Sequence, residues 1–209
     1  MKKIRILSLI IAVVMLLSLT SCTRKMTMNT SGITDKKSGI TYNFVTVPLI
    51  PKEKSTEAYA VWKMSKDVKI NLYEINGLDP EKWLYSEVGD LLCSEKIDFP
   101  DLFAFSADKF FICYNSDITI SFAEITDEAE VSALVDCYVN GEGVSEPMVG
   151  GYNTYVVLFE SGAYDEFYYK LMIRVYEDAT YMFDRSTGIY VNIGSLLSDY
   201  LPDYYESEE

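Results

Sequence analysis

The sequence predicts an α+β fold, in which a largely antiparallel sheet is packed by two or three helices. Three observations lead to this class. Apolar and polar residues alternate in several short segments, which is typical of half-buried strands. Two pairs of such segments are separated by short polar turns, as in β-hairpins. Apolar residues at helical spacing follow a capping residue between the hairpins. Separate runs of strands and helices are the pattern of an α+β domain.

The first strands are expected soon after residue 40. Residues 42–47 alternate between apolar and polar side chains, and residues 58–64 are rich in strand formers. Residues 68–72 alternate again, and the turn signal Asn76-Gly77 follows them. These segments predict the N-terminal part of the sheet.

Three helices are expected. The clearest begins at Asp127, which has capping-box spacing to Glu130, and it ends at Asn140-Gly141. A short helix is predicted over residues 79–84, because an aspartate and a proline suit its first turn. Another is predicted over residues 195–201, before a proline. The apolar face of the first helix comprises Val131, Leu134, Val135 and Tyr138.

The remaining strands form hairpins in this prediction. Residues 110–114 and 118–122 flank one turn, and residues 180–183 and 189–193 flank another. Each hairpin precedes a predicted helix, so the two segments are either an internal duplication or a chance likeness. Two further strands are expected between them, over residues 152–159 and 167–176.

The N-terminus has the layout of a signal peptide. Residues 1–5 carry the positive charges Lys2, Lys3 and Arg5, and an uncharged apolar run of 14 residues extends over 6–19. That run is shorter than the roughly 20 residues of a membrane span. The run Leu19-Thr20-Ser21-Cys22 then closes the segment.

With this layout, the chain resembles a bacterial prolipoprotein. The resemblance implies that Cys22 becomes the first mature residue and carries lipid on its sulfur and amine. It also implies a lipid-anchored location at the cell membrane, facing outside the cytoplasm. An ordinary secretory signal and an uncleaved anchor are the alternatives, and both place the remaining chain on the same side.

The mature chain is expected to form one domain. Residues 1–21 are the predicted signal peptide, and residues 22–39 read as the lipidated N-terminus and a flexible polar tether. Residues 40–202 are the expected α+β domain, and residues 203–209 form an acidic tail that frays. The other cysteines are either three buried thiols or one disulfide with a free thiol. They are Cys93, Cys113 and Cys137.

Charge and composition exclude several functions. After the signal peptide, 15 Lys and Arg stand against 32 Asp and Glu, a balance of −17. Nucleic acid is therefore not an expected partner, because phosphate binding needs a basic surface. The acidity serves solubility, or it forms a surface for cations or a basic partner.

No catalytic residue, metal ligand or cofactor is predicted. The chain has no histidine, which excludes a Ser-His-Asp triad and a Cys-His dyad. Ser65 and Lys66 are adjacent and would point to opposite faces of a strand. Acids gather at Glu177, Asp178 and Asp184, but nothing fixes the separation that a glycosidase requires.

Tyrosines are dense near the C-terminus and offer either sheet packing or a binding surface. The leading hypothesis is a lipid-anchored extracytoplasmic binding or protein-interaction domain without catalysis, whose partner is an unknown protein or a cell-surface glycan. One alternative is a carboxylate-dependent enzyme that acts on cell-wall glycan or another extracellular polymer. Another is an accessory subunit of a membrane complex. The candidate binding residues are Tyr152, Tyr155, Tyr164, Tyr168, Tyr169 and Tyr176.

Overall fold

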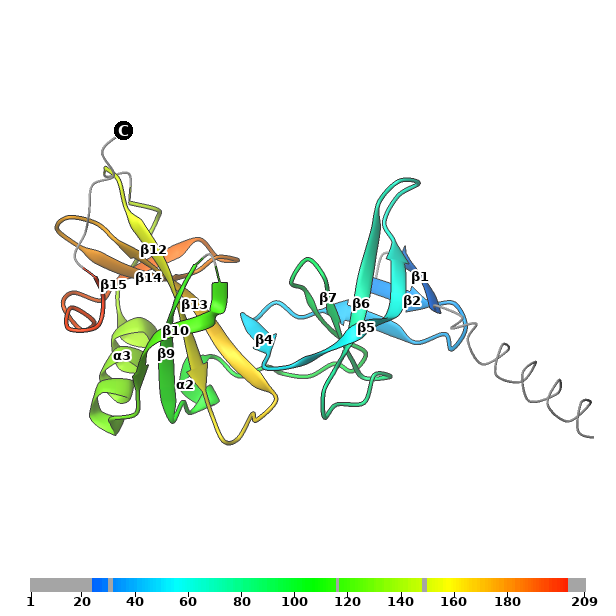
Figure 1. Ribbon diagram of the computed structural model, residues 1–209, viewed down its shortest axis with the longest axis horizontal. Coiled ribbons are helices and arrows are strands. Elements are labelled where there is room, and N and C mark those ends of the chain that lie inside the picture. The colour runs from blue at the N-terminus through cyan, green and yellow to red at the C-terminus, as the bar shows by residue number, and fades with distance from the viewer. Residues whose placement is uncertain (1–23, 30–31, 116, 148–149, 203–209) are drawn as a thin grey trace, which may run out of the picture.

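The computed structural model describes residues 24–202 except 30, 31, 116, 148 and 149 (Figure 1). This part of the chain is mostly β. It forms a closed barrel and a second sheet, and two helices accompany them. The predicted α+β class is therefore wrong: the fold is β-rich, because two of the three predicted helices do not form and the predicted tether contributes strands.

Seven strands form the barrel in the order β1-β2-β3-β8-β7-β6-β5. A parallel pairing of β1 with β5 closes it, and the other neighbours are antiparallel. Its core contains Met26, Ile33, Tyr42, Leu72 and Leu84. The strands are β1 (Arg24–Asn29), β2 (Gly32–Asp35), β3 (Thr41–Phe44), β5 (Lys54–Lys63), β6 (Lys69–Ile75), β7 (Trp83–Ser86) and β8 (Leu91–Cys93).

The second sheet has the order β10-β9-β12-β13-β14-β15-β11, and β4 pairs with β13 beside this path. The antiparallel pair β12–β13 lies at its centre. Both predicted hairpins are confirmed, as β9–β10 and β14–β15. The strands are β4 (Leu49–Pro51), β9 (Lys109–Tyr114), β10 (Asp117–Ile125), β11 (Gly143–Val144), β12 (Asn153–Glu160), β13 (Phe167–Val175), β14 (Thr180–Asp184) and β15 (Ile189–Asn192).

Strand β4 connects the two sheets. The chain leaves the barrel after β3, adds β4 to the edge of β13, and returns to the barrel as β5 (Figure 1). Leu49, Ile75 and Leu91 belong to the same apolar cluster as the core of the second sheet. The Trp83 ring also lies 5.3 Å from that of Phe167. The barrel and the sheet thus share buried apolar surface.

Helix α3 (Glu128–Asn140) forms where the sequence predicts it. The Asp127 carboxylate accepts hydrogen bonds from the backbone N–H groups of Ala129 and Glu130, at 3.0 and 3.1 Å. Three of the four predicted core residues of this helix are buried, and Tyr138 is half-buried. The helix ends at Gly141, where a Cβ would lie 2.3 Å from Val191 Cγ1. Close packing against β15 therefore requires glycine here.

The other two predicted helices are wrong. Over residues 79–84 the Asp79 carboxylate does accept from the Glu81 N–H, but the chain makes one turn and then extends into β7. Residues 195–201 form successive turns, with i to i+3 hydrogen bonds from Ser198 and Tyr200. The second proposed repeat unit thus lacks its helix. The sequence analysis also missed the one-turn helix α2 (Leu102–Phe105).

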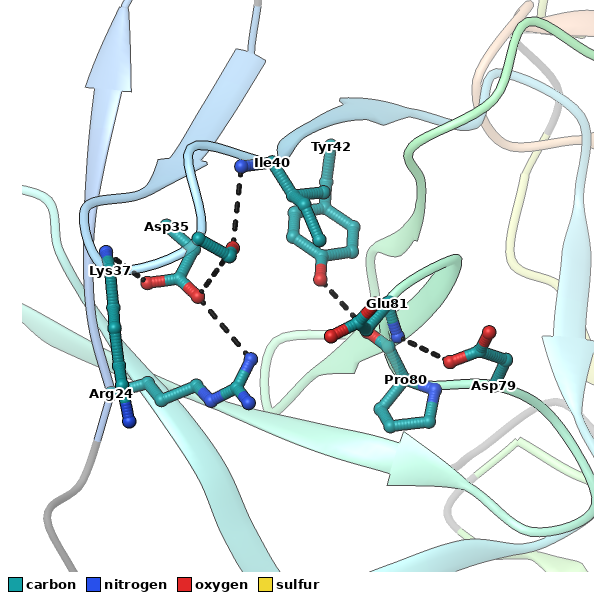
Figure 2. A network of polar contacts seen from close by, with 9 residues as sticks. Arg24, Asp35, Lys37, Ile40, Tyr42, Asp79, Pro80 and Glu81 are labelled. Atoms are coloured by element: carbon teal, nitrogen blue, oxygen red, sulfur yellow. Dashed lines mark hydrogen bonds and ion pairs between the residues drawn. The ribbon is translucent and has the colours of Figure 1, made fainter.

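The predicted tether is wrong over most of its length, because β1 and β2 occupy it. Figure 2 shows how their polar residues are held. Asp35 is fully buried and pairs with Arg24 at 3.3 Å. It also accepts hydrogen bonds from the Lys37 N–H at 2.9 Å and the Ser38 hydroxyl at 2.8 Å. The signal peptide, Cys22 and the acidic tail lie outside the described residues.

Candidate functional site

The candidate site is on the face of the second sheet opposite α3. Successive side chains of β13 point to opposite faces of the sheet. One set of side chains, including Tyr169 and Leu171, packs in the core under the helices. The other set comprises Tyr168, Lys170, Met172 and Arg174. Sequence analysis predicted this strand but did not single out its two basic residues.

A groove runs over this second face between β4, β13 and the β14–β15 turn. It consists of two adjoining hollows of about 370 and 440 Å³, a size typical of ligand sites. Asn115, Met172 and Arg185 line both hollows, so the two lie side by side. We call this feature the β13 groove. Its other lining residues include Val47, Leu49, Lys170, Arg174, Phe183 and Tyr190.

Positive charge concentrates on this face of a strongly acidic region. Residues 94–209 contain five Lys and Arg against 23 Asp and Glu. Lys170, Arg174 and Arg185 line the β13 groove, and Lys109 lies on the same face beside the Phe111 ring. Four of the five cations thus share one side of the sheet. Such local charge favours an anionic ligand despite the net negative charge.

Arg174 is held rigidly at one end of the groove. Its guanidinium carbon lies 4.2 Å from the centroid of the Tyr152 ring and 5.2 Å from that of Tyr190. It pairs with the Glu146 carboxylate. Burial alone would lower the pKa of Arg174, but the hydrogen bonds to Glu146 and Tyr176 outweigh it and raise the pKa. Arg174 is therefore a fixed positive charge.

Lys170 differs from the other cations because no carboxylate among the described residues forms an ion pair with it. It is half-buried in the groove. Desolvation lowers the pKa of its ammonium group, and the positive charge of Arg185 lowers it further. Arg185 likewise has no ion-pair partner in the described part of the chain. Within the described ranges, these two cations of the groove thus form no ion pair, although Asp90 and Asp184 line the same hollow.

The acids around the groove are already engaged. Asp184 accepts from the N–H and the hydroxyl of Ser186, at 2.8 and 2.7 Å. The Asp90 carboxylate accepts a hydrogen bond from the Ser86 hydroxyl at 3.3 Å, and that hydroxyl in turn accepts one from the Asp90 N–H. The Glu146 carboxylate pairs with Arg174. Asp90 and Asp184 both line the first hollow, and hydrogen bonds from serine leave their negative charges in place beside Lys170 and Arg185.

The six predicted tyrosines do not form one surface. Tyr155, Tyr169 and Tyr176 are buried, and Tyr164 stacks on Phe105 at 5.1 Å. Tyr168 packs against Phe111 on the groove side of the sheet. Tyr152 is 45% exposed and is the one that lines the β13 groove. Most of this tyrosine density therefore serves sheet packing.

The three described cysteines are free thiols. Cys93 and Cys113 are buried, and burial raises the pKa of each, which disfavours the reactive thiolate. Cys137 is half-buried, and its thiol faces the Asn192 carbonyl at 3.7 Å. None of the helices in the described ranges is long and apolar enough to cross a membrane.

Sequence reasoning missed the residues of the β13 groove, although a signal for them exists. Lys170 and Arg174 lie four residues apart on a strand, so their side chains share a face of the sheet. Basic residues are also scarce in this half of the chain, which makes such a pair conspicuous. Arg185 follows in the next turn. Comparison with models of protein families, curated proteins and solved structures finds no match for this chain.

Proposed function

We propose that this protein is a lipid-anchored extracytoplasmic binding domain, without catalysis, whose β13 groove holds an acidic segment of a partner protein. The lack of an ion-pair partner for Lys170 and Arg185 among the described residues carries this proposal. A carboxylate placed between them would restore the ion pairing that the protein itself leaves out. The apolar floor of the groove, which includes Met172, would accept neighbouring apolar side chains.

A peptide fits the groove better than a sugar. Stacking of a sugar ring requires an accessible aromatic face. Phe183 and Tyr190 are buried and stack on each other at 4.3 Å, and the Arg174 guanidinium lies over one face of the exposed Tyr152 ring at 4.2 Å.

Lys170→Met tests the groove. We expect this variant to be more stable by about 1 kcal/mol, because it removes a desolvated and unpaired cation. We also expect it to bind acidic peptides roughly 10- to 100-fold more weakly, since a charge-assisted hydrogen bond contributes about 1.5–3 kcal/mol. Thermal unfolding gives the first quantity. Fluorescence anisotropy with a labelled peptide of alternating Glu and Leu gives the second.

Lys109→Met is the matched control, because Lys109 lies on the same face but is paired with Glu124 at 3.2 Å. It should leave peptide affinity unchanged. If Lys170→Met lowers stability and leaves affinity intact, Lys170 is structural and the groove is not the binding site. Preference for a uronic-acid oligosaccharide over the peptide would assign the groove to a glycan instead.

Cys22→Ala tests the anchor. The wild-type protein should partition into membranes, and mass spectrometry should find a diacyl or triacyl group on an N-terminal Cys22, because stable anchoring requires more than one chain. The variant should not mature to a lipidated form. Recovery of an unmodified mature N-terminus in the culture medium would contradict lipid anchoring.

A further inference from the structure

The β5–β6 hairpin of the barrel ends in an exposed tip with basic and apolar residues. Figure 1 shows this hairpin projecting beyond the other strands. Every residue of the tip, 63–69, is exposed. Met64 and Val68 are 59% and 45% exposed. Scattered apolar residues on a surface are ordinary, but here two lie within one turn among three lysines and one acid, Asp67. This composition suggests a ligand with an apolar and an anionic part.

The lysines of the tip repel one another. Lys63 and Lys69 are directly opposite in the β5–β6 register, a destabilising arrangement for like charges. Lys66 lies in the turn between them, and no ion pair joins these lysines to an acid in the described ranges. An anionic surface would relieve this repulsion.

Strand β1 extends the same surface toward the N-terminus. It runs parallel to β5, with Lys25 opposite Val61 and Met26 opposite Trp62. Two residues further along, Met28 is 57% exposed at the rim. The barrel wall formed by β1 and β5 thus reaches from Arg24 to the hairpin tip. Arg24 follows Cys22 by two residues, which span at most about 7 Å.

Charge is divided between the two halves of the mature chain. Residues 22–93 carry ten Lys and Arg against nine Asp and Glu, whereas residues 94–209 carry five against 23. The β1 and β2 side of the barrel faces away from the second sheet (Figure 1). A negatively charged membrane on that side would attract the wall and repel the acidic half.

We propose that the hairpin tip and the adjoining β1–β5 wall lie on an anionic lipid surface, with Met64 and Val68 entering the headgroup region. This inference rests on the proposed function only in that the lipid on Cys22 brings the wall to the membrane. It places the second sheet, which carries the β13 groove, on the side of the barrel away from the lipid (Figure 1). Each lysine near the surface adds to the attraction of an anionic membrane.

The test separates the tip from the anchor. The chain from residue 22 with Cys22→Ser keeps every described residue and carries no lipid. At low salt we expect it to float with phosphatidylglycerol vesicles and not with phosphatidylcholine vesicles. Lys66→Glu combined with Lys69→Glu should reduce the bound fraction at least tenfold. Lys82→Glu combined with Lys96→Glu alters the net charge equally and should have a much smaller effect.

Insertion is measured with Val68→Trp and vesicles of brominated phosphatidylglycerol. The added fluorescence should be quenched, whereas that of Val88→Trp, in the exposed β7–β8 turn, should not. Equal loss of binding in the two charge variants, or absence of quenching at residue 68 while the protein is bound, would overturn the proposal. Failure of lipidation at Cys22 would leave these results unchanged and would count against the anchor alone.

Discussion

Gly32→Ala should destabilise the barrel by about 3 kcal/mol or more, among the largest effects expected of a single substitution. Gly32 has φ +149°, and a Cβ there would lie 2.2 Å from the Tyr42 carbonyl oxygen. That oxygen belongs to the backbone of β3, whose residue Tyr42 pairs with Ile33. The clash can be relieved only by separating β2 from β3. Thermal and urea unfolding of the purified protein measure the loss.

Gly39→Ala distinguishes this clash from a general cost of replacing glycine. Gly39 also has a positive φ, +77°, but nothing lies within 4 Å of an added Cβ. Gly39→Ala should therefore lower the free energy of unfolding by roughly 1–2 kcal/mol, the usual penalty of the left-handed conformation. Similar losses for the two variants would show that the contact with Tyr42 is unimportant.

Asp35→Ala should cost about 3 kcal/mol at neutral pH, because it removes one partner of a buried ion pair. Burial would raise the pKa of this carboxyl group. The hydrogen bonds from Lys37 and Ser38, together with Arg24, outweigh burial and lower the pKa below its ordinary value of 3.8. The carboxylate therefore stabilises the fold above the unfolded-state pKa, and this stability is lost as pH falls through the folded-state pKa.

The wild-type protein should consequently lose more stability than Asp35→Ala between pH 7 and pH 2. Urea unfolding at a series of pH values measures the difference. Parallel losses in both proteins would mean that Asp35 titrates alike in the folded and unfolded states. Ser38→Ala removes one hydrogen bond to Asp35 and leaves the ion pair. Its loss of stability between pH 7 and pH 2 should lie between that of the wild-type protein and that of Asp35→Ala.

The sequence predicts those elements whose signals are local. Helix α3 has a capping aspartate and an apolar stripe, and both hairpins have alternating strands around a polar turn. The barrel is less visible, because β1 and β2 each contribute few buried side chains, such as Met26 and Ile33, among polar residues. The barrel closes through pairings between segments that are distant in the sequence, β1 with β5 and β3 with β8, and no local pattern contains that information.

The candidate site is predictable only in part. The alternation of residues 167–176 gives the strand and the common face of Lys170 and Arg174. It does not show that the β4 segment lies against this strand, which is what closes one side of the groove. The density of tyrosines did not indicate the binding surface, because tyrosines such as Tyr155 and Tyr169 are buried in the core of the sheet.

The crossing of β4 has a mechanical consequence. The chain passes from barrel to sheet, back to the barrel and again to the sheet, so no single cut separates the two parts cleanly. Pro48 accepts a hydrogen bond from the Lys170 N–H at 2.7 Å, and β4 is paired along β13. In the proposed function, tension between the lipid anchor and a partner in the groove would act on this strand pairing, and binding in the groove would then depend on the integrity of the barrel.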